Sequence, residues 1–127
     1  MDLLEVFGES SDRVNYPTGS VIFEEGSEAE FMYVVIEGEI SLSLHDHTIA
    51  MVSPGAIVGE MALLDSSVRS ATATAASDCV LVPIDIHSFK SLIQYTPDFA
   101  LHVMSVLAQR LRRVNEALTG DVSGQNS

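Results

Sequence analysis

The sequence is poor in cysteine, tryptophan and basic side chains, and it has no long apolar run. The single cysteine, Cys79, excludes a disulfide within the chain, which is typical of a reducing compartment. No stretch approaches the roughly 18 apolar residues that span a bilayer, and no basic-then-apolar signal segment begins the chain. These absences predict a cytoplasmic protein with no membrane partner. Cys79 lies in "CVLVPI" and is expected to be a small buried side chain, not a reactive thiol.

Basic side chains are also scarce. The chain has 6 basic and 18 acidic residues, which give a formal net charge of −12. A nucleic-acid surface needs a basic stripe, so we expect no DNA binding from this chain. Three arginines lie near the C-terminal end of the last predicted helix, where the helix dipole favours cations. They are Arg110, Arg112 and Arg113. Arg69 is the only basic residue between positions 14 and 89. An isolated cation among carboxylates either pairs with one of them or serves a ligand.

What the 127 residues do contain is 46% hydrophobic side chains, enough for one domain with a core. Over residues 14–84, short runs of β-branched and aromatic residues alternate with turn-like segments such as "YPTG", "EGE" and "SPG". Ile40, Leu42 and Leu44 alternate with serines, as in a strand with one buried face. "HDH" is expected at a hairpin tip. The pattern predicts an antiparallel β-roll or jelly roll (a double-stranded β-helix), after a short lead-in over residues 1–13.

The periodicity becomes helical after residue 84. Asp85 is a candidate N-cap for a helix over 86–95, and Thr96 with Pro97 begins a second helix that runs to about Leu118. Gly120 is expected to end it, before a flexible tail over 120–127. The whole chain is therefore predicted to be mainly β with two C-terminal helices over 85–119 (α+β), the last one long.

An apolar seam in three- and four-residue steps follows the last helix, and it consists of Leu101, Met104, Ala108, Leu111, Asn115 and Leu118. Such a heptad seam is typical of a dimer interface, where one Asn fixes the register. An amphipathic helix that packs its apolar face onto the β-roll accounts for the seam equally well. A homodimer through residues 101–118 is therefore one of two open interpretations.

The segment "VGEMALLDSSVRSATATA" combines a glycine, a short helix-forming run and the isolated Arg69. Gly59 allows close approach of the backbone, and the N–H groups that begin a short helix favour an anion. Arg69 adds a planar cation and Ser70 a hydroxyl. Glu60 suits a sugar hydroxyl instead, so the set predicts a nucleotide with one phosphate. The competing interpretation is a surface ion pair of Glu60 and Arg69 beside a loop.

The stretch "GEMALLDSSVRSAT" resembles the phosphate-binding cassette of the cyclic-nucleotide-binding domain, the module of catabolite activator protein, protein kinase A regulatory subunits and cyclic-nucleotide-gated channels. The family pattern is Gly-Glu-x-Ala-Leu, a short gap, then Arg-x-Ala-Thr/Ser. Seven positions fit it, namely Gly59, Glu60, Ala62, Leu63, Arg69, Ala71 and Thr72. Upstream, "EEGSEAEFMYVVIEGEI" is similar to the early strands of the family, with Tyr33 between its glycines. Val58 and Val68 depart from the common residues without removing a polar contact.

The resemblance implies a role for each cassette residue. Glu60 would accept the ribose 2′-hydroxyl, and Arg69 would pair with the cyclic phosphate. Backbone N–H groups near Met61, Ala62 and Ala71 would complete the anion cradle, and Ser70 would add a hydroxyl. A hydroxyl at this position occurs with both ligands in the family, and cAMP is favoured over cGMP without the preference being settled.

The resemblance also implies a regulatory domain and not an enzyme. Bound ligand would draw the cassette inward with Leu63 as the hinge, and the last helix would cover the base, with Arg110, Val114 and Asn115 as lid residues. An effector protein or domain that the sequence does not identify would receive the signal. No catalytic nucleophile with its base is visible, and no metal or cofactor is expected.

Two alternatives belong to other classes. A cupin-like metalloenzyme shares the roll architecture, and His45 and His47 form a His-x-His pair of the kind that binds zinc or iron. The downstream Glu and His of such a site are missing, so exposed histidines in a hairpin turn explain the pair better. A degenerate scaffold without ligand is the other alternative, and the presence of both Glu60 and Arg69 argues against it.

Overall fold

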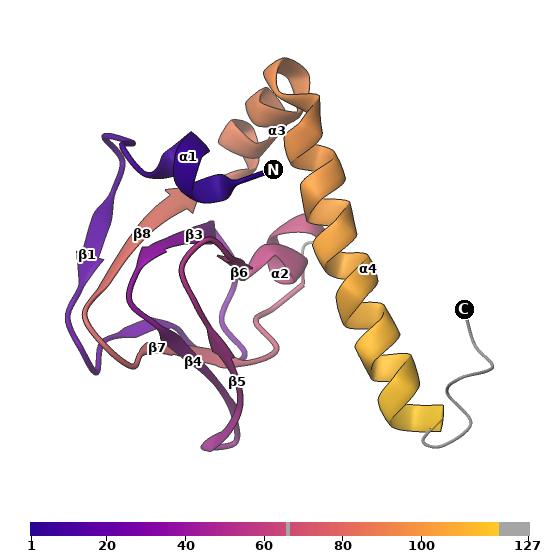
Figure 1. The fold of residues 1–127 in the computed structure, drawn as a ribbon. Coiled ribbons are helices and arrows are strands. Elements are labelled where there is room, and N and C mark those ends of the chain that lie inside the picture. Colours follow the sequence, from indigo (N-terminus) through magenta and orange to yellow (C-terminus); the bar gives the residue numbers. More distant parts are fainter. Residues whose placement is uncertain (66, 120–127) are drawn as a thin grey trace. The chain divides into compact units, whose positions relative to one another are not determined.

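The computed structural model describes residues 1–65 and 67–119, which form eight strands and four helices (Figure 1). The described chain divides into two compact units. The roll unit is Asp2–Phe89, and the helical unit begins at Lys90 and includes Met1. The boundary falls inside the first of the two C-terminal helices, so each unit is described by itself.

Two four-stranded sheets build the roll unit, with strand orders β1-β8-β3-β6 and β2-β7-β4-β5, and every neighbouring pair is antiparallel. The strands are β1 (Val14–Tyr16), β2 (Val21–Phe23), β3 (Met32–Glu37), β4 (Ile40–Leu44), β5 (His47–Val52), β6 (Ile57–Val58), β7 (Thr72–Ala75) and β8 (Cys79–Ile84). The predicted antiparallel β-roll is confirmed. β6 was not expected, because two residues beside a turn are too short for a periodic signal.

The core of the roll unit draws on both sheets. Its buried members are Tyr33 and Val35 of β3, Ile40 of β4, Val52 of β5, Val58 of β6, Ala73 and Ala75 of β7, and Cys79 and Leu81 of β8. The expected buried face of β4 holds only at its start, because Ile40 is fully buried, Leu42 is half-buried and Leu44 is 36% exposed. The far end of the β4–β5 hairpin therefore extends beyond the core.

The β4–β5 hairpin closes through the two residues His45 and Asp46, as "HDH" predicts. Both have positive φ, 50° and 68°. Two left-handed residues in succession are the mark of a type I′ turn, whose twist matches that of the flanking strands. The pairing register of the two strands shifts between Leu42 and Ser43, near the turn.

The helices begin where their capping residues place them. α1 spans Leu3–Phe7, α2 spans Glu60–Asp65, α3 spans Ile86–Tyr95 and α4 spans Pro97–Thr119. Asp85 caps α3 as predicted, since its Oδ1 accepts the Ser88 N–H at 2.7 Å. α4 begins at Pro97, where the missing N–H costs nothing. Gly120 and the predicted tail over 120–127 lie outside the described residues.

The apolar seam of α4 is exposed. Leu101 and Leu111 are each 62% exposed, and Leu118 is 80% exposed. Met104, Ala108 and Asn115 are exposed as well. The buried side chains of α4 are Phe99 and Val103, on another face of the helix. Whether the seam meets a second copy or the β-roll therefore stays a prediction with two interpretations. None of the described helices is apolar over the length that crossing a bilayer demands.

Candidate functional site

The site is built around Arg69, whose side chain lies inside the roll unit and is only 4% exposed. Its Nη1 donates to the Gly59 carbonyl at 2.7 Å, and its Nη2 donates to the Phe31 carbonyl. Its Cζ lies 4.0 Å from the centre of the Phe23 ring. The Nε is buried and has no hydrogen-bond partner among the described residues. Arg69 therefore joins three segments that are distant in sequence, and its Nε–H is still available as a donor.

Gly59 and Arg69, the two ends of the cassette, meet directly. Gly59 has φ +80° and lies between β6 and α2. A Cβ at this position would lie 2.5 Å from Arg69 Nη1 and 3.1 Å from Cε2 of Phe23. Only glycine leaves room for the guanidinium at this carbonyl and also adopts the left-handed conformation without strain.

The backbone of Arg69 is held as firmly as its side chain. Its carbonyl accepts the Gly26 N–H at 2.8 Å, and its own N–H donates to the Ser27 carbonyl at 2.8 Å. Val68 forms a β-bridge with Glu28 next to these bonds. The turn after β2 therefore fixes the backbone position of Arg69.

Glu60 is the first residue of α2, and its side chain is fully buried. The burial of both Glu60 and Arg69 makes the interpretation as a surface ion pair wrong. A buried carboxylate is costly unless it is paired or hydrogen-bonded. Glu60 and Arg69 are the buried charged residues of the described chain, and both belong to the cassette.

The remaining cassette residues occupy different environments. Ala62 and Leu63 are buried in α2, whereas Met61 on the same helix is 52% exposed. Ser70 is exposed and Ala71 is half-buried in the stretch that leads into β7. The first N–H groups of α2, which include those of Met61 and Ala62, have no acceptor within the helix itself. The predicted cradle donors thus lie at the start of α2, the end that Gly59 joins to Arg69.

A hollow of about 350 Å³ borders the cassette in the roll unit. Leu63 lines it from α2, and Ile86 lines it from the first residue of α3. The cassette and the start of the C-terminal helices therefore share one space. The proposed lid residues Arg110, Val114 and Asn115 lie on α4 in the helical unit, and their role stays a prediction.

Burial shapes the protonation of the groups around Arg69. Burial lowers the pKa of Arg69, and the nearby Tyr33 opposes this shift. The pKa of Tyr33 is raised to about 12, first by its own burial and then by Tyr16. Both groups therefore lie in a region from which water is largely excluded, where a charge-assisted contact is stronger than at the surface.

Sequence reasoning did not identify Phe23 and Phe31 as neighbours of Arg69. Phe31 contributes its backbone carbonyl, which any residue type offers, so no signal marks it. Phe23 contributes its ring from the last residue of β2. Its one signal was an aromatic residue in a short strand directly before "EEG", which core packing explains equally well.

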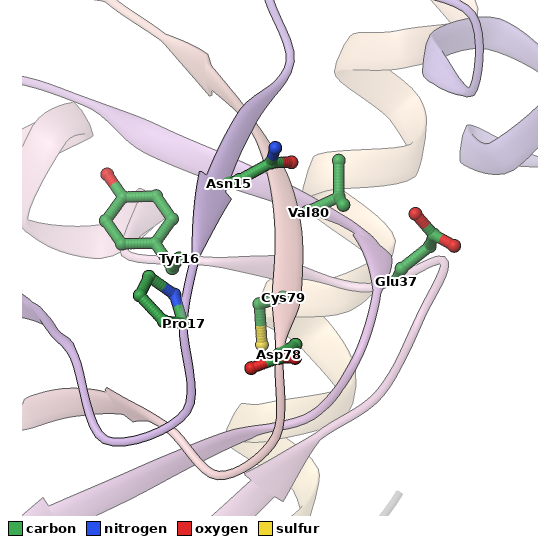
Figure 2. A pocket seen from close by; sticks show the side chains of 7 residues that line it. All are labelled: Asn15, Tyr16, Pro17, Glu37, Asp78, Cys79 and Val80. Carbon is green, nitrogen blue, oxygen red and sulfur yellow. The ribbon is translucent and has the colours of Figure 1, made fainter.

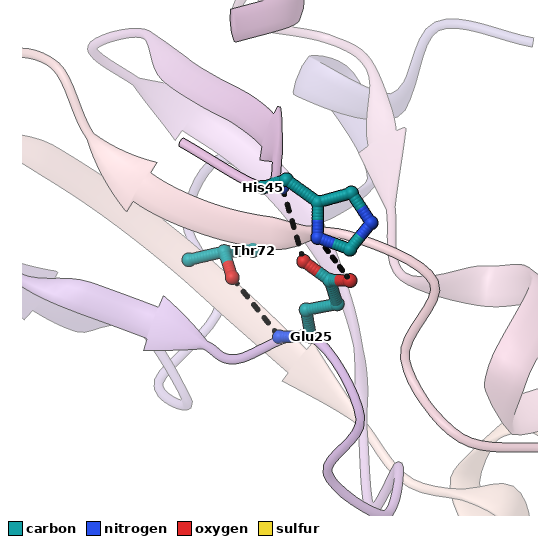
Figure 3. Close-up of polar contacts among 3 residues, drawn as sticks. All are labelled: Glu25, His45 and Thr72. Carbon is teal, nitrogen blue, oxygen red and sulfur yellow. Dashed lines mark hydrogen bonds and ion pairs between the residues drawn. The ribbon is translucent and has the colours of Figure 1, made fainter. Parts of the chain in front are cut away.

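His45 has a carboxylate neighbour, Glu25, in the structure. The Nδ1 of His45 lies 3.5 Å from Oε2 of Glu25, and the His45 backbone N–H donates to Oε1 of the same carboxylate at 3.3 Å (Figure 3). The N–H of Glu25 donates in turn to the Thr72 hydroxyl at 3.0 Å. No group of three His, Cys, Asp or Glu side chains in residues 1–65 and 67–119 is placed to hold a metal ion. The histidine thus ties the hairpin tip to the turn that holds the cassette.

A second hollow, of about 440 Å³, lies elsewhere in the roll unit and is lined by Asn15, Tyr16, Pro17, Glu37, Asp78, Cys79 and Val80 (Figure 2). Cys79 is only 2% exposed there. Its thiol donates to the Glu39 and Ser77 carbonyls, each at 3.3 Å, and burial raises its pKa. The prediction of a small buried side chain at Cys79 is confirmed.

Comparison with known proteins follows the same residues. Residues 13–96 match the sequence model of the family described as the cyclic nucleotide-binding domain. The chain is 34% identical over 105 residues to the cyclic AMP receptor protein of Thermus thermophilus. The aligned region covers 79% of this chain and 49% of that protein. The chain thus spans about half the length of the curated relatives it matches.

Solved structures agree with the sequence match. The crystal structure of the Thermus thermophilus catabolite activator protein superposes with a TM-score of 0.78 at 34% identity, over 84% of this chain and 53% of that one. An EAL enzyme is similar in its cGMP-bound and cAMP-bound forms, with TM-scores of 0.63 and 0.62 at 27% and 26% identity. These two matches cover 83% and 84% of this chain, and 29% and 30% of the enzyme.

Proposed function

Because the chain belongs to the cyclic nucleotide-binding domain family, we propose that its roll unit binds a cyclic nucleotide and acts as a regulatory sensor. The observation that carries the proposal is the contact of Gly59 with Arg69, which closes the cassette around a buried guanidinium. In this proposal the domain binds and signals, and it catalyses no reaction.

The cassette residues would divide the ligand between them. Arg69 and the N–H groups near Met61, Ala62 and Ala71 would hold the cyclic phosphate, because guanidinium and helix-start donors both favour an anion. The exposed Ser70 hydroxyl would add one more donor. Glu60 at the start of α2 would accept the ribose 2′-hydroxyl.

Phosphate binding would draw on the unused N–H donors of Arg69. A guanidinium has five N–H donors in one plane, and two of those of Arg69 now go to the Gly59 and Phe31 carbonyls. The buried Nε–H is available to an anion without breaking either bond. The second N–H groups of Nη1 and Nη2 remain as well, so a phosphate could be bound while both carbonyl bonds stay in place.

The segment that follows Gly59 offers a route for the signal. Leu63 follows the Gly59 turn on α2 and shares a hollow of about 350 Å³ with Ile86 of α3. We propose that the cassette moves inward with Leu63 as the hinge, and that ligand shifts the population toward this state. Arg110, Val114 and Asn115 of α4 would then cover the base.

The ligand is proposed to be cAMP ahead of cGMP. The name of the Thermus thermophilus relative supports cAMP, whereas the EAL enzyme is solved with either nucleotide. A hydroxyl at Ser70 is compatible with both. The preference therefore rests on the relative, and a direct competition between the two nucleotides decides it.

The exposed seam of α4 supports a homodimer as the assembled form. Leu101, Leu111 and Leu118 are more than half exposed in a single chain, and they follow the three- and four-residue steps of a parallel pair. Sedimentation with and without nucleotide tests this, because a dimer doubles the mass. An effector protein or domain in the cytoplasm would receive the signal.

Isothermal titration with cAMP and with cGMP tests the proposed function. We expect saturable binding of at least one nucleotide, and a loss of affinity of about 100-fold or more in Arg69→Ala, since truncating one partner of a buried charge contact costs about 2–5 kcal/mol. Glu60→Gln should lower the affinity for nucleotides that carry a ribose 2′-hydroxyl. The weak affinity for a 2′-deoxy analogue should stay unchanged.

Arg13→Ala is the matched control, because Arg13 is an exposed arginine of the same unit. It should bind within about twofold of the parent chain. Thermal unfolding of each variant checks that it is folded at the temperature of the titration. Undiminished affinity in a folded Arg69→Ala chain would overturn the cassette assignment, and a metal-dependent activity lost in His45→Ala would favour the cupin alternative.

A further inference from the structure

Resting on the proposed function, we infer that Phe23 and Tyr33 form an aromatic shelf that positions the Arg69 guanidinium for the ligand's phosphate. Phe23 is then a positioning residue for nucleotide binding, although it touches the arginine and not the ligand. The inference comes from the contacts beneath Arg69, outside the cassette itself.

The geometry of the shelf suits a cation. Cζ of Arg69 lies 4.0 Å from the centre of the Phe23 ring, well inside the ~6 Å range of cation–π attraction. Phe23 stacks on Tyr33 with ring centres 6.2 Å apart and 20° between the planes. The Phe23 ring thus contacts both the guanidinium and the Tyr33 ring.

Tyr33 is anchored, so the shelf has a fixed base. It is a buried residue of β3 and belongs to the core of the roll unit. The Tyr16 ring meets it edge-on at 6.5 Å and 90°, and the Phe31 ring lies 6.1 Å away at 52°. Contacts with three aromatic rings thus hold Tyr33 in place beside Phe23.

The strand that carries Phe23 is adjusted at that residue. β2 pairs with β7 through Val21 with Thr74 and Phe23 with Ala73, so the register shifts between the two. Such an irregularity re-aims a side chain, and here the re-aimed ring meets both Arg69 and the space left by Gly59. A Cβ on Gly59 would lie 3.1 Å from the Phe23 ring.

A ring is well suited to this task because it attracts the charge without using an N–H donor. Carbonyls of Gly59 and Phe31 take two donors of Arg69, whereas the ring of Phe23 takes none. The shelf thus restricts a long, flexible side chain and leaves the free Nε–H for an anion. Without the ring, the arginine has to be ordered when the ligand binds, and affinity falls.

Progressive fluorination of one ring tests the inference, because fluorine withdraws the charge of the ring face and barely changes its shape. We would replace Phe23 with mono-, di- and trifluorophenylalanine and titrate each chain with the nucleotide that binds the parent best. The dissociation constant should rise with every fluorine, by about tenfold over the series, the order expected for a buried cation–π contact.

The matched control is the same series at Phe7, a buried ring in α1 outside the cassette. Its affinities should stay within about twofold. A second comparison uses ordinary residues: Phe23→Tyr keeps the ring and should bind like the parent, whereas Phe23→Leu should lose about tenfold. Thermal unfolding of both separates this pattern from a packing role, for which affinity would follow the unfolding temperature.

The outcomes separate the two proposals. A parent chain that binds neither nucleotide overturns the proposed function, and the shelf as a ligand-positioning device falls with it. A parent chain that binds, with affinities that are flat across the Phe23 fluorine series or that shift equally at Phe7, overturns the shelf alone.

Discussion

The two arginines of the roll unit, Arg13 and Arg69, show how differently one side chain behaves in two settings. Arg13 is exposed, and its Nη2 lies 3.4 Å from a carboxylate oxygen of Glu37, which is exposed too. Arg69 is 4% exposed and is held by two backbone carbonyls and a ring. The surface arginine has a fully charged partner, whereas the contacts of the buried one are to neutral groups.

A charged partner therefore does not determine how much an arginine contributes to stability. An exposed ion pair exchanges one set of solvent contacts for another and is worth about 0–1 kcal/mol. A buried guanidinium that satisfies two carbonyls leaves them without a donor when it is removed, which costs more than the net worth of the bonds. Arg69 is therefore the arginine expected to contribute to both the stability of the fold and the affinity for a ligand.

The largest expected effect comes from removing each arginine in turn. Arg69→Leu should lower the free energy of unfolding by about 3 kcal/mol, because the Gly59 and Phe31 carbonyls lose their donors in a dry site. Arg13→Leu should cost less than about 1 kcal/mol. Urea unfolding of both variants measures this. Equal losses would remove the contrast between the two sites.

Gly59 provides the next test, since it controls the room around Arg69. Gly59→Ala should destabilise the fold by about 2 kcal/mol from its left-handed backbone and also displace the guanidinium, so nucleotide affinity falls with stability. Gly19→Ala is the matched control, because Gly19 has a similar φ of +90° and nothing lies within 4 Å of a Cβ there.

Gly19→Ala should lose stability from the backbone alone and bind nucleotide like the parent. Calorimetric titration and urea unfolding of the pair give the two quantities independently. If both alanine variants bind equally well, the close approach at Gly59 has no role in the site.

A smaller effect is expected at Asp78, an exposed carboxylate that responds to pH. Its Oδ1 accepts the Thr18 backbone N–H at 2.9 Å and the Thr18 hydroxyl at 2.8 Å, and these bonds lower the pKa of Asp78. A lowered pKa in the folded state adds stability above the ordinary value of about 4 and loses it as the pH falls through the folded value.

The stability difference between the parent and Asp78→Ala should therefore be constant from pH 5 to 7 and shrink below pH 4. Urea unfolding at a series of pH values measures it. A difference that is as large at pH 3 as at pH 6 would show that the carboxylate charge is not what these bonds stabilise.

The smallest effect belongs to Glu37→Gln, which breaks the ion pair of Arg13. The free energy of unfolding should change by about 0.5 kcal/mol or less, and the change should vanish in 1 M salt, where exposed charges are screened. Chemical unfolding at low and high salt checks this. A salt-independent loss would place the pair in a drier environment than its exposure indicates.

The sequence predicted the parts of the site that depend on residue type and spacing. A glycine before a short helix and an isolated arginine ten residues later were enough to expect Gly59 near Arg69, and alternating apolar runs were enough for the roll. Asp85 and Pro97 placed the helix starts in the same way. These features are local, or belong to one recognisable motif.

What the sequence did not reveal depends on long-range packing. Phe31 reaches Arg69 with a carbonyl, which carries no side-chain signal, and Phe23 reaches it from a strand 46 positions earlier through a shifted register. The exposure of Leu101 and Leu111 was equally undetermined, since one amphipathic pattern fits a helix buried in its own chain or one that meets a partner.

The burial of Cys79 has a practical consequence for experiments in solution. The chain has one thiol, it is 2% exposed, and it lies against Gly38 in the core of the roll unit. An alkylating reagent can reach it only when β8 separates from its neighbours, so the rate of labelling reports how often the roll opens. A ligand that closes the cassette should slow that rate in proportion to its occupancy. The labelling rate of Cys79 thus reports ligand binding with no added dye or tag.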